Sequence, residues 1–231
     1  MAGDEGLQSG AAVTGTAVRV PVAGGVLDGD LSVPGRPRAV VVFAHGSGSS
    51  RHSPRNRRVA EKLQQAGYAT LLMDLLTASE DEVDARTREL RFDIARLASR
   101  LTAAVDWLAS QPRLLPLPVV TFGASTGAAA ALRTAADRPQ RVRLVVSRGG
   151  RPDLAGHALA RVHAPTLLIV GGSDREVLRL NQQAAARIAG AVEIAVVPGA
   201  THLFEEPGAL DAVIDLALEA LERHLGARVT E

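Results

Sequence analysis

The chain of 231 residues carries a formal net charge of +1, a hydrophobic content of 46 %, only 3 % aromatic residues and no cysteine. The lack of cysteine excludes disulfide bonds, thiolate catalysis and cysteine-based metal sites. The balanced charge predicts neither a nucleic-acid partner nor association with an anionic membrane, and the apolar content suffices for a sizeable core.

The N-terminal segment is acidic and lacks an apolar stretch, so it does not have the pattern of a signal peptide. No apolar run approaches the roughly 18–20 residues that a membrane-spanning helix needs. We therefore predict a cytoplasmic protein with a disordered tail over residues 1–14. Residues 15–231 are predicted to form a single domain, since no linker or internal repeat interrupts them.

The first half of the chain opens with two short strands around Gly24 and Gly25, a pattern typical of a hairpin. Residues 38–45 form an apolar, β-branched run, as expected of a strand that is buried on both faces. The elements that follow are predicted to be a helix over 54–66, a strand over 69–73, a loop over 75–82 and one long amphipathic helix over 83–110.

The second half continues the alternation of strands and helices. Strands are predicted over 117–122, 142–147, 166–170 and 192–197, helices over 128–136, 175–189 and 206–224, and an irregular segment over 148–162. This alternation predicts an α/β fold with a mostly parallel sheet that helices cover on both faces. The chain has no insertion long enough for a large lid domain, so we expect an open site.

Function in such sheets lies beyond the carboxyl ends of the strands. The segment Gly123–Gly127 reads G-A-S-T-G, which matches the G-x-S-x-G pattern, and it lies between an apolar strand and a helix. A sharp strand-to-helix turn of this kind exposes the central serine, and large flanking side chains would collide. The pattern therefore identifies Ser125 as a nucleophile.

A serine hydroxyl needs a base, and the base needs an acid to orient it. His202 follows the last predicted strand, and Asp174 follows the strand before it. The order Ser125, Asp174, His202 is the order of nucleophile, acid and base that this turn predicts. Asp153 and Glu176 remain alternative acids.

An oxyanion needs preorganised N–H donors. The backbone N–H of Thr126 is one candidate, and the N–H of Ser47, in the loop after the strand that ends at His45, is the other. His45 itself is expected to have a structural role. The chemistry requires no cofactor and no metal, and His157 and His163 are interpreted as ordinary loop residues.

Two arginines, Arg148 and Arg151, follow a strand at the same edge and could bind a substrate carboxylate or phosphate. The alternative is a salt bridge to Asp153, Glu205 or Glu206. A basic cluster formed by Arg51, His52, Arg55, Arg57 and Arg58 is interpreted as solvated surface, with binding of an anionic substrate as the alternative. We expect the pocket shape to depend on Leu75, Leu76, Leu154, Leu203 and Phe204.

These features together resemble the α/β-hydrolase superfamily over residues 16–225. Within it the chain is similar to the bacterial dienelactone-hydrolase-like group, and to the hydrolase portion that some bacteria fuse to a phosphoribosyltransferase. The segments that carry this likeness are MDLLTASE, SRGGRPDLAG, APTLLIVGGSD and PGATHLFEEPGAL. The resemblance implies an α/β-hydrolase fold and places the catalytic triad on Ser125, Asp174 and His202.

The chain departs from the resemblance in its nucleophile, since dienelactone hydrolases use a cysteine and this chain has none. We therefore predict a serine hydrolase that cleaves carboxylic esters of small molecules through an acyl-enzyme. A thioester, lactone or amide hydrolase with the same triad, or a binding module without catalysis, remains an alternative. The sequence does not locate exposed apolar patches, so it predicts no oligomeric state.

Overall fold

The computed structural model describes residues 15–226, and the predicted N-terminal tail lies outside this range. Eight strands form one sheet: β1 (Thr16–Val22), β2 (Gly25–Ser32), β3 (Val40–Ala44), β4 (Ala69–Met73), β5 (Val119–Ala124), β6 (Val142–Arg148), β7 (Thr166–Gly171) and β8 (Val192–Val197). The helices are α1 (Pro54–Gln65), α2 (Ala78–Thr87), α3 (Ile94–Ala109), α4 (Thr126–Asp137), α5 (Arg175–Ala185) and α6 (Ala209–Leu225), with short 3-10 segments η1 (Leu90–Phe92) and η2 (Pro152–Arg161).

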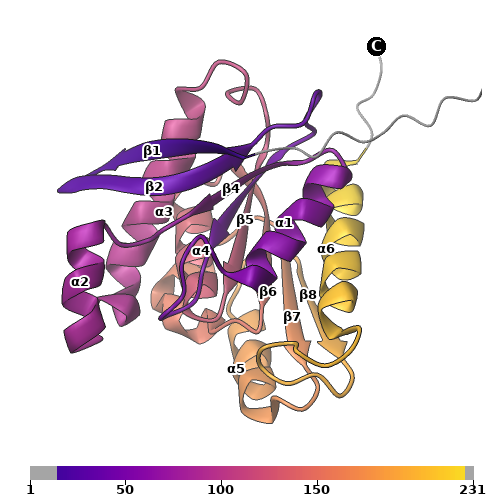
Figure 1. The fold of residues 1–231 in the computed structure, drawn as a ribbon. Coiled ribbons are helices and arrows are strands. Elements are labelled where there is room, and N and C mark those ends of the chain that lie inside the picture. Colours follow the sequence, from indigo (N-terminus) through magenta and orange to yellow (C-terminus); the bar gives the residue numbers. More distant parts are fainter. Residues whose placement is uncertain (1–14, 227–231) are drawn as a thin grey trace, which may run out of the picture.

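The strand order is β1-β2-β4-β3-β5-β6-β7-β8. The six strands β3 to β8 pair in parallel, while β1 and β2 form the predicted antiparallel hairpin and join the sheet through β4. The parallel arrangement places the carboxyl ends of β5 to β8 at one edge of the sheet, at the bottom of Figure 1. The predicted α/β fold with a mostly parallel sheet is confirmed.

Alternate residues of the central strands face two separate cores, because successive side chains of a strand point to opposite faces. Val40 and Val42 of β3 face the core that contains α3 and α4, whereas Val41 and Phe43 face the core that contains α1 and α6. All five residues of β3 are buried, as its continuous apolar run predicts. Figure 1 shows the two helical layers on opposite sides of the sheet.

The prediction of one long helix over 83–110 is wrong. Helix α2 begins within the predicted loop 75–82, and the chain then turns at Arg88, whose φ is 59°, before η1 and α3. Thr77 starts α2 through a capping box, in which its hydroxyl accepts from Glu80 N–H and the Glu80 carboxylate accepts from Thr77 N–H. Asp93 caps α3 by accepting from Arg96 N–H. The sequence carried this Thr-x-x-Glu signal, but the continuous helical periodicity obscured it.

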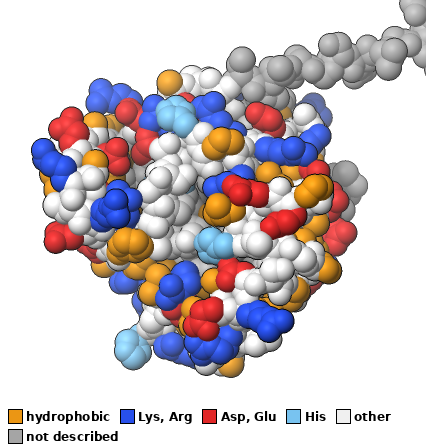
Figure 2. Space-filling model, turned by 60° about the horizontal axis from the view of Figure 1, so that its bottom comes forward, with side chains coloured by type: hydrophobic (Ala, Val, Ile, Leu, Met, Phe, Trp, Pro, Cys, Tyr) orange, Lys and Arg blue, Asp and Glu red, His pale blue; other side chains and the backbone are white. Residues whose placement is uncertain are grey.

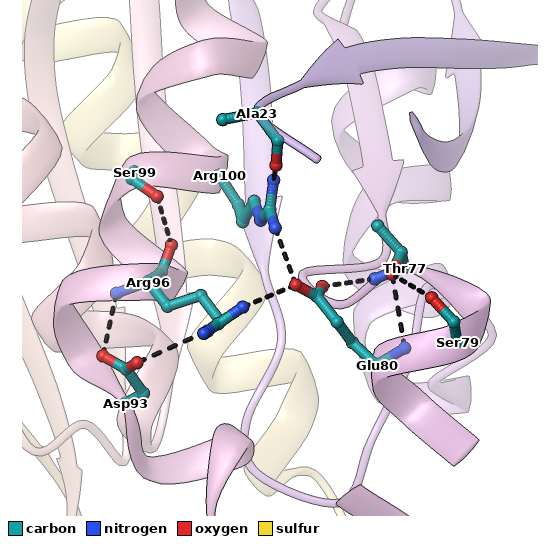
Figure 3. A network of polar contacts seen from close by, with 8 residues as sticks. All are labelled: Ala23, Thr77, Ser79, Glu80, Asp93, Arg96, Ser99 and Arg100. Atoms are coloured by element: carbon teal, nitrogen blue, oxygen red, sulfur yellow. Dashed lines mark hydrogen bonds and ion pairs between the residues drawn. The ribbon is translucent and has the colours of Figure 1, made fainter. Parts of the chain in front are cut away.

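Glu80 also ties α2 to α3 (Figure 3). Its Oε1 atom accepts hydrogen bonds from Arg96 at 2.6 Å and from Arg100 at 2.7 Å. Arg100 is buried and donates in addition to the carbonyl of Ala23 in the β1–β2 turn. One carboxylate therefore joins the start of α2, the helix α3 and the hairpin.

We expect Glu80→Gln to lower the free energy of unfolding by about 2 kcal/mol, because it leaves the buried Arg100 cation without a charged partner. Burial raises the pKa of Glu80, but the Thr77 N–H and the two arginines outweigh this and hold it below its ordinary value of 4.5. The stabilisation is thus complete above pH 4.5 and is lost as the pH falls through the lower pKa of the folded state.

Urea unfolding at neutral pH and at acidic pH checks this prediction. The difference in free energy of unfolding between wild type and Glu80→Gln is expected to become smaller at acidic pH, because a protonated Glu80 resembles glutamine. Glu82→Gln on the exposed side of α2 is the matched control. If the two proteins differed in free energy of unfolding by the same amount at both pH values, the charge of Glu80 would not be the source of the stabilisation.

Candidate active site

The loops that follow β3, β5, β6, β7 and β8 meet at the carboxyl edge of the sheet. Figure 2 views the molecule from this edge and shows a hollow strip of backbone and small polar side chains between charged and hydrophobic side chains. Charges of both signs are interspersed around the hollow. The residues predicted for catalysis all lie on these loops.

Ser125 lies in a strained turn between β5 and α4. Its φ of 51° and ψ of −122° fall in a region that non-glycine residues rarely occupy. The flanking glycines permit the turn, since a Cβ at Gly123 would collide with the backbone of Ala128 and a Cβ at Gly127 with the carbonyl of Ala44. The half-buried serine is thus held at the start of α4, as the G-x-S-x-G pattern predicts.

His202 and Asp174 are brought together from two different loops. The His202 Nδ1 atom lies 2.8 Å from Asp174 Oδ2, and the His202 side chain is 39 % exposed while that of Asp174 is 17 % exposed. Since an ionised carboxylate only accepts, Nδ1 carries the proton in this pair and Nε2 has a free lone pair when the ring is neutral. This is the arrangement that a general base requires.

The loop after β6 connects the serine to the histidine. Ser125 N–H donates to the Arg148 carbonyl at 3.4 Å, and Arg151 N–H donates to the Ser125 carbonyl at 2.9 Å. A Cβ added at Gly149 would lie 2.9 Å from the His202 carbonyl and 3.7 Å from its Nδ1. Ser125 and His202 therefore both contact the segment 148–151. Among the described residues, no hydrogen bond joins Ser125 Oγ to His202. Such bonds are often long in the absence of substrate.

The two alternative acids are engaged elsewhere. Asp153 accepts two hydrogen bonds from Arg151, at 2.9 and 2.8 Å. Glu176 accepts two from Arg179, at 3.1 and 2.6 Å. Of the three carboxylates considered from the sequence, Asp174 is the one that contacts His202.

The loop after β3 lies against the serine. A Cβ added at Gly46 would be 3.0 Å from Ser125 Cβ, so the backbone that leads to Ser47 approaches the nucleophile closely. Within residues 15–226 the Ser47 N–H has no hydrogen-bond acceptor, and the first N–H groups of a helix, such as Thr126 N–H, have no partner within it. Two donors are therefore available near Ser125.

His45 has the structural role expected of it. Its Nε2 accepts from Leu75 N–H at 3.1 Å, and its Nδ1 lies 2.9 Å from the Gly46 carbonyl. Burial lowers the pKa of His45. A neutral imidazole therefore fastens the loop after β3 to the loop after β4.

A cavity of about 340 Å³ adjoins the same loop. Gly46, which approaches Ser125, and Ser47 line it, whereas Ser125 itself does not, and its apolar wall includes Leu75, Leu76 and Leu97. Two ion pairs, Arg51–Asp74 and Arg91–Asp84, lie at its polar side. No residue of the His202 loop lines this cavity.

Sequence reasoning located only part of this cavity. Of the five side chains expected to shape the pocket, Leu75 and Leu76 line it. Leu154 and Phe204 pack instead in the two cores, and Leu203 is exposed on the surface. The ion pairs were missed: Arg51 and Asp74 are 23 residues apart, and Asp84 and Arg91 lie on either side of the turn at Arg88 that the predicted long helix did not contain.

Arg148, the last residue of β6, and Arg151, in the loop after it, have different environments. Arg151 forms the predicted alternative, a salt bridge to Asp153. Arg148 pairs with none of the three carboxylates considered and donates instead to the Asn56 side chain of α1 at 3.1 Å. Asn56 is a contact that the sequence did not indicate.

The family model for the dienelactone hydrolase family matches residues 27–227, which is most of the chain. The chain belongs to the dienelactone hydrolase family. It is thus a hydrolase-type α/β protein, and the resemblance recognised in its sequence is confirmed.

Individual relatives agree with this. A dienelactone hydrolase from Anabaena variabilis has a crystal structure that superposes with a TM-score of 0.89, at 57 % identity over 91 % of this chain and 97 % of that one. The structure of Est1E from Butyrivibrio proteoclasticus superposes with a TM-score of 0.72 at 15 % identity, over 89 % of this chain and 98 % of that one, which shows the shared fold alone.

A curated relative from Mycobacterium tuberculosis, provisionally named as a phosphoribosyl transferase, is 61 % identical over 206 residues. The match covers 89 % of this chain but only 44 % of that protein. The chain thus spans less than half the length of this relative.

Within residues 15–226, no group of three or more His, Asp or Glu side chains is placed to hold a metal ion. None of the helices described is both long enough and apolar enough to cross a membrane.

Proposed function

We propose that this protein is a serine hydrolase that cleaves carboxylic esters of small molecules through an acyl-enzyme on Ser125. The observation that carries the proposal is the His202–Asp174 hydrogen bond of 2.8 Å beside a serine in a strained strand-to-helix turn. Membership of a hydrolase family supports it.

In the first step His202 Nε2 removes the hydroxyl proton of Ser125 while Oγ attacks the ester carbonyl. The N–H groups of Ser47 and Thr126 donate to the oxyanion, and the N-terminal end of α4 adds a favourable dipole. His202 then gives its proton to the leaving alcohol as the carbon–oxygen bond breaks. Asp174 holds the ring in the required tautomer and stabilises the imidazolium.

In the second step a water molecule takes the place of the alcohol. His202 removes a proton from the water, and the resulting oxygen attacks the acyl-enzyme carbonyl. The tetrahedral intermediate collapses to release the carboxylic acid, and the proton returns to Ser125 Oγ. All groups used come from the described chain, and the step needs no cofactor.

The leaving alcohol must lie on the side of His202, because His202 protonates it. The acyl group then extends to the other side of Ser125, where Gly46 and Ser47 border the cavity of about 340 Å³. A cavity of this volume lies at the lower end of the range for small-molecule sites, so it limits the acyl group to the size of a small molecule. The substrates proposed are therefore esters of small carboxylic acids.

A series of p-nitrophenyl esters with increasing acyl length tests this proposal. The value of kcat/KM is expected to fall by at least about tenfold once the chain outgrows the cavity, a loss of about 1.4 kcal/mol. A fluorophosphonate probe should label Ser125, as identified by peptide mass spectrometry. Absence of both turnover and labelling would contradict the proposal and favour a binding module.

A further inference from the structure

Strands β1 and β8 form the two edges of the sheet, and they differ in how they are protected from further pairing (Figure 1). The unpaired N–H and C=O groups of an edge strand can pair with another strand, and prolines or exposed charges on natural edges prevent this. Strand β1 contains Pro21, which has no N–H to donate, and the exposed Arg19. Strand β8 contains no proline, and the charge of its Glu193 is paired with Arg223 of α6.

The backbone groups at the free edge of β8 belong to Val192, Ile194 and Val196. Gly172 N–H donates to the Val197 carbonyl at 2.8 Å, so the odd-numbered residues of β8 direct their backbone groups towards β7. Since these groups alternate in direction along a strand, those of the even-numbered residues point away from β7. In the described part of the chain, β8 pairs with β7 alone, and no backbone hydrogen bond outside that pairing reaches the even-numbered residues.

The side chains of the same three residues form an apolar row. They lie on one face of the sheet, because residues two apart along a strand share a face. The Val196 side chain is 44 % exposed, and Val192 and Ile194 are half-buried. Branched apolar side chains stabilise a pair of antiparallel strands when they lie opposite one another. The edge therefore suits a strand with a similar row of branched side chains.

Strand β8 is complementary to a second copy of itself in one antiparallel register. A twofold axis beside Ile194 places this residue opposite Ile194 of the second copy, and Val192 opposite Val196 of that copy. All these residues present their N–H and C=O groups outwards, so each opposed pair exchanges two hydrogen bonds. Glu193 then lies opposite Ala195 on the other face of the sheet, and no like charges oppose each other.

We propose that the protein forms a twofold-symmetric dimer in which the β8 strands of two copies pair antiparallel around Ile194. The pairing joins the two sheets into one and satisfies both free β8 edges at once, so the assembly closes at two copies. Its outer edges are then the β1 strands, which Pro21 protects. A strand of another protein would meet the same backbone groups, but the matching apolar row and the matching position for Glu193 are both present in this chain. The proposal is independent of the esterase function, because His202 lies in the loop beyond β8.

Analytical ultracentrifugation tests the dimer. We expect wild type to show a mass near twice the 24.1 kDa of one chain, with the dimer fraction falling on dilution. Val196→Lys places a charge opposite Val192 twice in each dimer, so it should raise the Kd by about tenfold or more. Val83→Lys is the matched control, because Val83 on α2 is 41 % exposed and lies outside β8. It should leave the Kd unchanged.

A pair of charge variants tests the register. Ile194→Lys and Ile194→Glu should each weaken the dimer, because each places two like charges directly opposite one another. An equal mixture of the two variants should recover a dimer, since the charges are then opposite in sign. Loss of folding cannot produce such a recovery. If circular dichroism shows that the Ile194 variants do not fold, a mixture of Val192→Glu and Val196→Lys applies the same test to the neighbouring pair.

Hydrogen exchange locates the contact. The amides of Val192, Ile194 and Val196 should exchange slowly in the wild-type dimer and faster in Val196→Lys, whereas the amides bonded to β7 should be protected in both. A wild-type mass equal to that of one chain up to about 1 mM would overturn the proposal. A dimer that persists in Val196→Lys and in both Ile194 variants would also overturn it, as would the absence of recovery in the mixture of folded variants.

Discussion

Ser125→Ala is expected to lower kcat for p-nitrophenyl acetate by about 10⁴-fold or more. The substitution removes the oxygen that forms the acyl-enzyme in the proposed mechanism. No neighbouring hydroxyl can take its place unless the strained turn at Ser125, with its φ of 51°, moves. The oxyanion donors and the acyl cavity remain, so weak residual turnover through direct attack by water is consistent with the mechanism.

The measurement is steady-state hydrolysis at matched purity, with Tm as the test of folding. Alanine carries the same Cβ as serine, so the strain of the turn is unchanged and the Tm should stay close to that of wild type. Ser99→Ala, an exposed serine of α3 that donates to the Arg96 carbonyl, is the matched control. If a folded Ser125→Ala variant kept a kcat within tenfold of the wild-type value, Ser125 would not be the nucleophile.

Asp174→Asn is expected to lower kcat by about 10⁴-fold while KM changes little. Asparagine preserves the shape of the side chain, but its amide favours the wrong tautomer of His202 and cannot stabilise the imidazolium. The 2.8 Å contact between Asp174 Oδ2 and His202 Nδ1 is the bond affected. Steady-state kinetics with the best substrate of the ester series gives kcat and KM separately.

The same measurement distinguishes the three candidate acids. Asp153→Asn and Glu176→Gln are the matched controls, since their carboxylates pair with Arg151 and Arg179. Each is expected to change kcat by less than about tenfold, because surface ion pairs contribute about 0–1 kcal/mol. A larger loss in Asp153→Asn than in Asp174→Asn would reassign the acid.

The proposed mechanism uses only loops at the carboxyl edge of the sheet. In it, the acyl group lies on the side of the loops after β3 and β4, and the leaving group lies on the side of His202 in the loop after β8. Helix α2 contributes Ala78, Asp81 and Asp84 to the acyl cavity, and the Glu80 contacts hold that helix against α3. We therefore expect acyl specificity to depend on a helix that the sequence periodicity had merged with its neighbour.

The predicted strands were largely right because a parallel strand that is buried on both faces leaves a continuous apolar run. Ser125, Asp174 and His202 could be selected for a related reason: each lies in the loop that follows a predicted strand, and the carboxyl ends of parallel strands share one edge. The error over 83–110 arose where helical periodicity continued across a break. There the local signals were the caps at Thr77 and Asp93 and the left-handed Arg88.

The sequence by itself therefore determined the α/β class, the family and the order of the candidate catalytic residues, since each depends on local patterns and on their order along the chain. Only the tertiary structure decided which carboxylate contacts His202, which arginine is paired, and where the cavity lies. Those features depend on contacts such as Arg148 with Asn56, 92 residues apart. The free energy of a buried charge is set by the groups that folding brings around it, and no local pattern encodes them.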